Sequence, residues 1–554
     1  MITLLQPVRK RWFPPAPVTG AGGFLRAAGR MFLRRTVDQK TGFLVALVGA
    51  VLACWNILGA PGYQDDEGTY TAQALSSLHG SLAPYTYWYD HPPLGWLQLG
   101  ALSWLPGLIG QGGEVYVGQM RYVVAVFFVA STVLVFLIAR RLQLRLPFAV
   151  LAALLYCTSP LSLVLGRQVF IDNVGLPWLL MAFYLVLSPK LKLWDHVGAG
   201  VCFAVAVLSK ETLAIFGPAL LLALLHRPYW ETRLFSLVGF LSVGGLVLGF
   251  FPLLAILQGE LLAGPGHVSL QDALTYQFLS RPGSGTFLDP ASGRHELVMG
   301  WAYYDSRLIL LGLAAALVCL AFRESRWIPV ALLLFAAPVM MGQGYLPAMY
   351  VIGAIPFLVL AIAVAADLTG RTLPRLFRLK PFGKGLASKA ALTAPGARHI
   401  ALAVSGTAVI FGLATVVVPP WISMNHKLMV SNDNADWNEA LRWSKDNLPK
   451  DDVALVPYSM WHDLNADGRH DPWKVIALEK MDLDSDFAAR HPEGWRSIDW
   501  IVEGPPTKRN ITNLGLDNAG RALENSSVVA SFGDWKVRKV LKAPVPSTSI
   551  EDQK

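Results

Sequence analysis

Long apolar segments recur along this chain, and their length constrains the fold more than any other feature of the sequence. About 20 apolar residues span the hydrocarbon core of a bilayer as a helix. We identify eleven segments of this length or somewhat shorter, at 42–60, 120–139, 147–165, 172–188, 197–209, 212–226, 234–257, 307–322, 327–342, 346–366 and 400–418. Only 15% of the residues are charged and 53% are hydrophobic, whereas soluble domains carry roughly 25% charged residues. The sequence therefore predicts a polytopic α-helical membrane protein, with a transmembrane domain over 42–418.

The residues after the last apolar segment have the composition of a soluble domain. A helix is expected at 436–448, strands at 453–458, 474–478 and 497–502, a helix at 514–525, and a strand or hairpin at 528–540. This alternation predicts a small α/β domain over 419–554. The domain has no glycine-rich phosphate fingerprint and no catalytic triad. Asn510 and Asn525 begin short glycosylation-type motifs, which are common by chance.

The distribution of charge predicts the topology. The net charge is +9, and basic residues crowd the N-terminal segment 1–41 and the stretch 371–389, both of which flank spans. Such loops are typically cytoplasmic, and no aromatic-interleaved basic patch points to nucleic acid. With a cytoplasmic N-terminus and an uncleaved first span, every inside loop is basic. The loops 61–119 and 258–306 and the C-terminal domain then share the extracytoplasmic side.

The most unusual polar stretch follows the first apolar segment directly. Asp65, Asp66 and Glu67 are adjacent there, and Tyr89 and His91 follow in the same loop. Three neighbouring carboxylates cost free energy through repulsion and desolvation, so a site that uses negative charge is one interpretation. A solvated acidic loop explains the same pattern. The 258–306 loop, which contains His267, has the length of a lid or binding element.

Four further polar residues lie at predicted outer ends of spans: Arg167, Asp172, Lys210 and Tyr345. The first three have ordinary explanations, because Asp172 can cap a helix and Arg167 and Lys210 can extend to lipid headgroups. Gathered on the same face as the acidic stretch, these carboxylates and cations instead form a site that can take up a proton and hold a phosphate.

Taken in order, these motifs resemble those of the GT-C superfamily of integral-membrane glycosyltransferases. The resemblance rests on Asp66-Glu67, His91-Pro92-Pro93-Leu94, Arg167 to Asp172, Ser209-Lys210 and Tyr345-Leu346-Pro347, and it covers about 42–370. The branch it is most similar to contains protein O-mannosyltransferases and lipid A aminoarabinose transferases. The resemblance implies an inverting transferase in the plasma membrane, the inner membrane of a bacterium. It would move a sugar from a polyprenyl-phosphate donor to a hydroxyl acceptor (protein, lipid or cell-envelope glycan) on the extracytoplasmic face.

The resemblance also implies roles for individual residues. Asp66 matches the acidic residue that acts as base in the family, Glu67 lies beside it, and Asp65 is an alternative base. Asp172 matches a second functional acidic position. Arg167 and Lys210 are the candidates for the donor phosphate, and the remaining expected substrate-binding residues are His91, Tyr345, Tyr89 and His267.

Metal dependence and two other functions stay open at this stage. The four cysteines, Cys54, Cys157, Cys202 and Cys319, lie inside apolar segments without metal or disulfide spacing. No cofactor is required by the expected chemistry, although Asp65 and Asp66 could hold a divalent ion such as Mg²⁺ or Mn²⁺. A transporter or flippase for a lipid-linked sugar would place charges near the bilayer midplane. A non-catalytic assembly subunit would tolerate the loss of Asp66.

Overall fold

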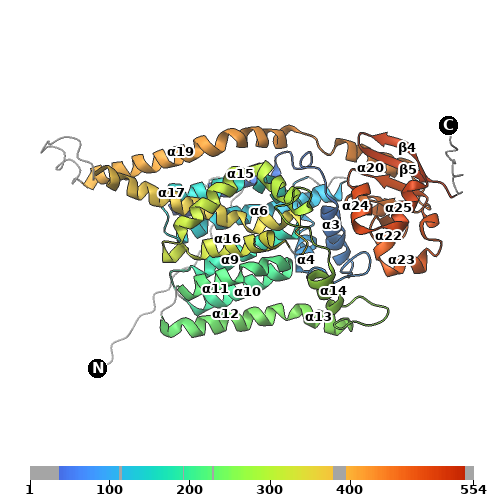
Figure 1. The fold of residues 1–554 in the computed structure, drawn as a ribbon, viewed down its shortest axis with the longest axis horizontal. Coiled ribbons are helices and arrows are strands. Elements are labelled where there is room, and N and C mark those ends of the chain that lie inside the picture. Colours follow the sequence, from blue (N-terminus) through green and yellow to red (C-terminus); the bar gives the residue numbers. More distant parts are fainter. Residues whose placement is uncertain are drawn as a thin grey trace, which may run out of the picture.

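The computed structural model describes residues 36–110, 115–190, 192–226, 230–342, 344–378 and 395–542. The N-terminal residues up to 35 and most of the basic stretch 371–389, both predicted to be cytoplasmic, lie outside these ranges. The described chain forms an elongated helical bundle with a small α/β domain at one end (Figure 1).

Each predicted apolar segment coincides with a helix or with two consecutive helices of the bundle. In chain order these are α2 Val37–Cys54, α6 Tyr116–Arg141, α7 Leu146–Thr158 with α8 Pro160–Gly166, α9 Ile171–Val186, α10 Leu193–Ser209, η1 Glu211–Phe216 with α11 Gly217–His226, α12 Arg233–Leu248 with α13 Phe250–Gln258, α15 Gly293–Cys319, α16 Trp327–Met341, η5 Ala348–Gly353 with α17 Ile355–Arg378, and α19 Pro395–Val430.

Within the described ranges, seven helices are long and apolar enough to cross a membrane, or eight if α7 and α8 form one bent span. The 58° bend between these two helices falls where Ser159 caps α8 and Pro160 follows at its first position, because proline cannot continue the hydrogen bonding of α7. The shorter apolar helices α9, α10 and η1–α11 complete the bundle. The protein is thus a multi-pass membrane protein, and the number of eleven spans stays a prediction.

The first extracytoplasmic loop of the sequence prediction is largely helical. It contains α3 Asp65–Ser77, α4 Leu94–Ala101 and α5 Leu105–Leu108. Helix α3 begins at the acidic stretch, and Asp65, Asp66 and Glu67 form its first turn. Carboxylates are favoured there by the unpaired N–H groups and the helix dipole.

The 258–306 segment is also more ordered than the long loop that was predicted. It contains α14 Leu270–Thr275, the π-helical turn η3 Tyr276–Ser280 and the first part of α15. Helix α15 is interrupted at Asp305, whose φ and ψ are −157° and 67°. The Asp305 carboxylate accepts the Leu308 N–H at 3.0 Å and so begins a new helical segment, close to the predicted span start at 307.

The C-terminal domain contains a five-stranded sheet in the order β2-β1-β3-β5-β4. Strands β1 Ala454–Val456, β2 Val475–Ala477 and β3 Trp500–Glu503 are parallel, and the hairpin of β4 Ser526–Phe532 and β5 Trp535–Val540 pairs antiparallel to β3. The strands lie where the sequence predicts them. The helices around them are α20 Ala435–Asn447, α21 Tyr458–Ala466, α22 Lys480–Leu483, α23 Ser485–Arg490, α24 Thr507–Leu514 and α25 Asp517–Glu524.

Two predicted boundaries in this region differ from the structure. The helix expected at 514–525 is replaced by α24 and α25, which are separated at Gly515 with φ of 64°, a left-handed conformation that ends a helix. The apolar helix predicted to end at 418 continues through Pro419 and Pro420 to Val430. The predicted domain boundary at 419 therefore falls inside α19, which runs along the bundle to the C-terminal domain (Figure 1).

Helix α3 packs directly on α21 and so joins the bundle to the C-terminal domain. At the contact, a Cβ added to Gly68 would lie 2.1 Å from the Tyr458 carbonyl oxygen. Because that atom belongs to the backbone, it cannot move aside as a flexible side chain would. The close approach of the two helices therefore requires glycine at position 68.

We predict that Gly68→Ala separates α3 from α21 and lowers the free energy of unfolding by about 1–3 kcal/mol, the usual cost of overpacking. The measurements are the thermal midpoint in detergent and the rate of proteolytic release of the C-terminal domain. Gly300→Ala is the matched control, because nothing lies within 4 Å of a Cβ there. Equal behaviour of the two variants would contradict the contact.

Candidate active site

A cavity of about 1260 Å³ lies between the first loop, the α14–η3 segment and the C-terminal domain. Asp65, Asp66, His91, Arg281 and Tyr345 line it from the side of the bundle, and Tyr458, Glu479 and Trp535 are among the residues that line it from the C-terminal domain. Four of the ten site residues predicted from the sequence thus face one space: Asp65, Asp66, His91 and Tyr345.

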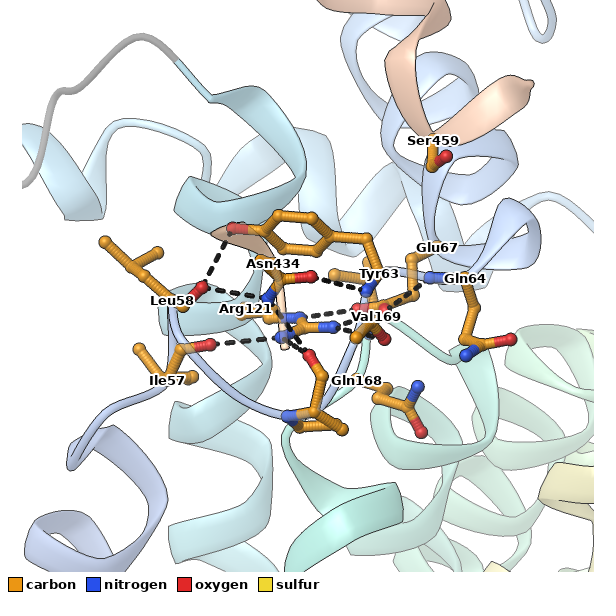
Figure 2. Close-up of polar contacts among 12 residues, drawn as sticks. Ile57, Leu58, Tyr63, Gln64, Glu67, Arg121, Gln168, Val169, Asn434 and Ser459 are labelled. Carbon is orange, nitrogen blue, oxygen red and sulfur yellow. Dashed lines mark hydrogen bonds and ion pairs between the residues drawn. The ribbon is translucent and has the colours of Figure 1, made fainter. Parts of the chain in front are cut away.

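Beneath the acidic turn, Glu67 and Arg121 form a buried ion pair (Figure 2). Neither side chain is exposed to solvent. Arg121 Nε donates to Glu67 Oε2 at 2.8 Å, and its Nη2 donates to Oε1 at 2.6 Å. The remaining guanidinium hydrogens reach the carbonyl oxygens of Ile57, Pro61 and Gly62 at 3.1, 2.7 and 3.3 Å. All five donors of the arginine fork are therefore used.

Glu67 accepts two further hydrogen bonds from the main chain. The Gln64 N–H donates to Oε1 at 3.1 Å, and the Val169 N–H donates to Oε2 at 2.9 Å. Val169 lies in the turn just before α9, the helix that carries Asp172. Glu67 was predicted among the catalytic carboxylates, but its burial and four hydrogen bonds leave no free oxygen for a substrate. We correct its role to that of a positioning residue, which fixes the helix of Asp66 relative to that of Asp172.

The C-terminal domain holds the same turn from the opposite side. Asn434 Nδ2 donates to the carbonyl oxygens of Leu58 and Pro61 at 2.9 and 3.1 Å, and its Oδ1 accepts the Tyr63 N–H at 2.8 Å (Figure 2). The residues between the first span and α3 are thus hydrogen-bonded both to α6 and to the C-terminal domain.

Asp65 and Asp66, the two carboxylates that precede Glu67, have different surroundings. Asp66 is exposed to the cavity, and Asp65 accepts the Ser459 N–H at 3.4 Å across the interface with α21. Desolvation raises the pKa of Asp66 above its usual range, whereas the nearby charges of Lys210, His91 and Arg281 act to lower it. Desolvation raises the pKa of Asp65 to about 6. Asp66 is therefore the carboxylate surrounded by positive charge.

A second charged cluster, from the start of α4 and the α10–η1 junction, lies beside Asp66. His91 Nδ1 is 3.0 Å from Glu211 Oε2, so the network assigns a proton to Nδ1. Lys210 Nζ lies 3.3 Å from His91 Nε2 and 3.4 Å from Glu211 Oε1. Burial acts to lower the pKa of His91, but the Glu211 carboxylate raises it above its usual value. Lys210 is only 2% exposed, so its ammonium group stays next to the His91 ring.

Asp172 is buried next to this cluster and does not line the cavity. It is 1% exposed and interacts electrostatically with Lys210, Glu211 and His91. Its Oδ2 has no hydrogen-bond partner among the described residues. Asp172 is therefore close enough to Lys210 to balance part of its charge. The role of Asp172 as a second acidic site residue stays a prediction.

Arg281 completes the positive side of the cavity. Its guanidinium carbon lies 3.8 Å from the centroid of the Tyr345 ring, and its Nη1 donates to Gln277 Oε1 at 2.8 Å. These contacts hold the η3 turn against the residue that precedes the 346–366 span. The sequence offered no motif for Arg281, because its closeness to Asp66 arises only from folding.

Three predicted site residues lie elsewhere. Arg167 is fully buried, donates to the Leu52 carbonyl and contacts Met429 Sδ at 3.3 Å, away from the cavity lining. Tyr89 donates to Glu260 Oε2 at 2.7 Å and so ties the first loop to the end of α13. His267 lies 3.2 Å from the Leu262 carbonyl oxygen within its own loop. Tyr89 and His267 thus have structural contacts, whereas Nε and Nη1 of Arg167 have no hydrogen-bond partner among the described residues.

No group of three or more His, Cys, Asp or Glu side chains in the described ranges is arranged to hold a metal ion. Asp65 and Asp66, the pair considered for a divalent ion, have different surroundings, since Asp65 is bound to Ser459.

Comparison with known proteins places this geometry in a wider context. A family model described as dolichyl-phosphate-mannose-protein mannosyltransferase matches residues 90–256. Among solved structures, ArnT from Cupriavidus metallidurans bound to undecaprenyl phosphate matches with a TM-score of 0.53 at 15% identity, over 94% of this chain and 98% of that chain. The fold is that of the GT-C glycosyltransferases. The resemblance found in the sequence is thereby confirmed.

A second solved structure agrees. Archaeal oligosaccharyltransferase AglB from Archaeoglobus fulgidus, in complex with an inhibitory peptide and a dolichol-phosphate, matches this chain with a TM-score of 0.51 at 16% identity. The match covers 85% of this chain and 70% of that chain. No curated protein sequence matches the chain.

We predict that Arg121→Ala lowers the free energy of unfolding by about 3–5 kcal/mol, because Glu67 is left as an unpaired buried charge. Arg121→Lys should recover little of this loss, since an ammonium cannot reproduce the five-donor fork. Thermal unfolding in detergent is the measurement. Arg140→Ala is the control, because the Arg140–Asp38 pair is partly exposed and such pairs contribute roughly 0–1 kcal/mol. A loss no larger than that of the control would refute the role of the pair.

Proposed function

We propose that this protein is an inverting glycosyltransferase that moves a sugar from a polyprenyl-phosphate donor to an acceptor hydroxyl. The observation that carries the proposal is the position of Asp66, a carboxylate exposed to a large cavity and flanked by Lys210, His91 and Arg281. This combination supplies a base beside fixed positive charge. The GT-C fold and the lipid phosphates bound in the two solved relatives support the same assignment.

In the proposed reaction, the acceptor oxygen attacks the anomeric carbon from the face opposite the phosphate. The bond between that carbon and the phosphate oxygen breaks, and the electron pair leaves with the polyprenyl phosphate. Asp66 takes the proton of the acceptor hydroxyl. A phosphate leaves as a stable anion, so the second carboxylic acid that glycosidases use to protonate a leaving alkoxide is not required.

The donor phosphate is assigned to the positive side of the cavity. Arg281, held on Tyr345, lines the cavity, whereas Lys210, held against His91, lies outside the described lining and acts on Asp66 through its charge. Fixed cations at this point stabilise the negative charge that develops on the leaving phosphate. Arg167, expected from the sequence to share this role, is replaced in the proposal by Arg281. Arg281 lines the cavity and its charge acts on Asp66, whereas Arg167 is buried and contacts Leu52 and Met429.

The membrane arrangement follows from the same assignment. We place the cavity and the C-terminal domain on the extracytoplasmic side of the plasma membrane, the inner membrane in a bacterium, and the N-terminus in the cytoplasm. This agrees with the basic inside loops. The phosphate would then sit at headgroup depth, with the isoprenoid chain along the apolar bundle. The charged cluster lies at the end of the bundle next to the C-terminal domain, which favours catalysis over a transport path through the midplane.

We predict that Asp66→Asn reduces transfer by about 10²–10⁴-fold while donor binding is retained, because the exchange keeps the shape and removes the base. In the wild type, kcat/KM should rise with pH through the raised pKa of Asp66, since only the deprotonated form accepts a proton. The measurement is radiolabel transfer from a panel of polyprenyl-phosphate sugars to an envelope extract.

Asp433→Asn is the matched control, because Asp433 lines the same cavity without being flanked by these cations. It should retain activity. Normal turnover by Asp66→Asn would remove Asp66 as the base, and loss in Asp65→Asn alone would transfer the role to Asp65. Movement of labelled lipid across vesicles without any transfer would favour the transporter.

A further inference from the structure

The proposed mechanism uses only the bundle side of the cavity and leaves the opposite wall without a role. That wall is contributed by the turn at 504–506, helix α24 and the first residue of β5. It lines the same space as Asp66. A transferase needs a second substrate next to its base, so the chemistry of this wall bears on the identity of the acceptor.

Trp535 forms a fixed aromatic surface on this wall. Its side chain is half-buried and packs against Gly504, where an added Cβ would lie 2.6 Å from a carbon of the indole ring. Pro505 and Pro506 line the cavity next to it. An indole packed against the backbone at Gly504 presents a preorganised apolar face.

Two amide side chains adjoin this surface. Asn510 and Asn513 are three residues apart on α24 and therefore lie on one face of the helix, and both line the cavity. Neither side-chain amide has a hydrogen-bond partner in the part of the chain that the structure describes. Each offers two donors and one acceptor to a ligand. The glycosylation-type motif at Asn510 thus lies in a helix that faces a cavity.

The charge of the cavity argues against an anionic acceptor. Six carboxylates line it, Asp65, Asp66, Asp90, Asp272, Asp433 and Glu479, against the three cations Arg281, Lys480 and Arg509. The two cations on the C-terminal side already have partners. Lys480 Nζ lies 3.2 Å from the centroid of the Trp88 ring, and Arg509 Nη1 lies 3.9 Å from Glu296 Oε1. Burial raises the pKa of Asp65 to about 6 and that of Glu479 to about 7, so these two carboxylates are only partly charged near neutral pH. The argument against an acceptor phosphate is that the two cations of the C-terminal side are already engaged.

The described lining of the cavity does not offer one common mode of binding a polypeptide acceptor. Extended peptides are commonly bound by adding a strand to the free edge of a sheet. Strands β2 and β4 form the edges of this sheet, and neither contributes a residue to the described lining of the cavity. Trp535 is the one strand residue in that described lining. It contributes its side chain to the cavity and does not provide a free strand edge.

We propose that this wall binds the acceptor and that the acceptor is an uncharged glycan. A sugar ring would stack its C–H face on Trp535 while its hydroxyl groups hydrogen-bond to Asn510 and Asn513. An aromatic face beside unpaired amides matches a neutral polyol, which has both apolar faces and many weakly acidic hydroxyls. This inference rests on the proposed transferase function and names its second substrate.

The experiment supplies wild-type protein in lipid nanodiscs with a labelled polyprenyl-phosphate sugar and three acceptor fractions. An envelope extract is separated into neutral glycans, anionic glycans and glycolipids, and protein. We expect the label in the neutral fraction. In the double variant Asn510→Ala/Asn513→Ala, the KM for that fraction should rise about tenfold or more, the loss expected for two hydrogen bonds, with the KM for the donor unchanged.

Trp535→Phe should retain most activity and Trp535→Ala should lose it. Asn447→Ala is the matched asparagine control, because Asn447 is exposed at the end of α20 and does not line the cavity. Label in the anionic or protease-sensitive fraction, or unchanged acceptor KM in the double variant, would overturn the glycan assignment and leave the transferase function intact. No label in any fraction, with wild-type protein that still binds the donor, would instead count against the proposed function itself.

Discussion

The buried ion pair between Glu67 and Arg121 is the interaction on which the rest of the site depends. An arginine in the first turns of a long apolar helix is costly to bury unless every donor is satisfied. Here all five donors are used, two on Glu67 and three on carbonyl oxygens of the chain before α3. The pair thus holds the chain before α3 in place, and Asp66 is presented to the cavity as a consequence.

The same constraint connects the two sides of the cavity. Glu67 binds the turn before α9 through Val169, and Asn434 of the C-terminal domain binds the turn before α3. Asp65 accepts a hydrogen bond from Ser459, and Gly68 allows α3 to approach α21. A movement of the C-terminal domain would therefore shift the backbone of α3 and with it the position of Asp66. We infer a division of labour in which the bundle provides base and phosphate site and the C-terminal domain provides the acceptor wall.

Much of this architecture could be predicted from the sequence, since apolar length and the alternation of strand and helix patterns depend on local composition. The positions of the bundle helices that coincide with apolar segments, and of the five strands, follow those patterns. The grouping of Asp66, His91, Lys210 and Tyr345 was also predictable, because each lies at a predicted outer end of a span or in a loop expected on that face. The boundary at 419 was not, since the structure continues α19 through two prolines to Val430.

The distinction between neighbouring carboxylates could not be predicted. Asp66 and Glu67 are adjacent, and only the folded chain shows that one faces the cavity and the other is buried on Arg121. Arg121 itself lies within a predicted apolar span, where its charge gave no indication of a partner 54 residues earlier. Arg281 was not predicted but lies in the cavity, and Arg167 was predicted but lies outside it. In both cases the position of the cation relative to Asp66 is set by tertiary packing.

The most direct test of the account is a structure of the wild-type protein, determined by electron cryomicroscopy in a nanodisc, with polyprenyl phosphate bound. We expect the phosphate inside the cavity, contacting His91 or Arg281 and facing Asp66, with the lipid chain along the helical bundle. A phosphate bound at Arg167, or anywhere outside the cavity that Asp66 lines, would contradict the proposed site.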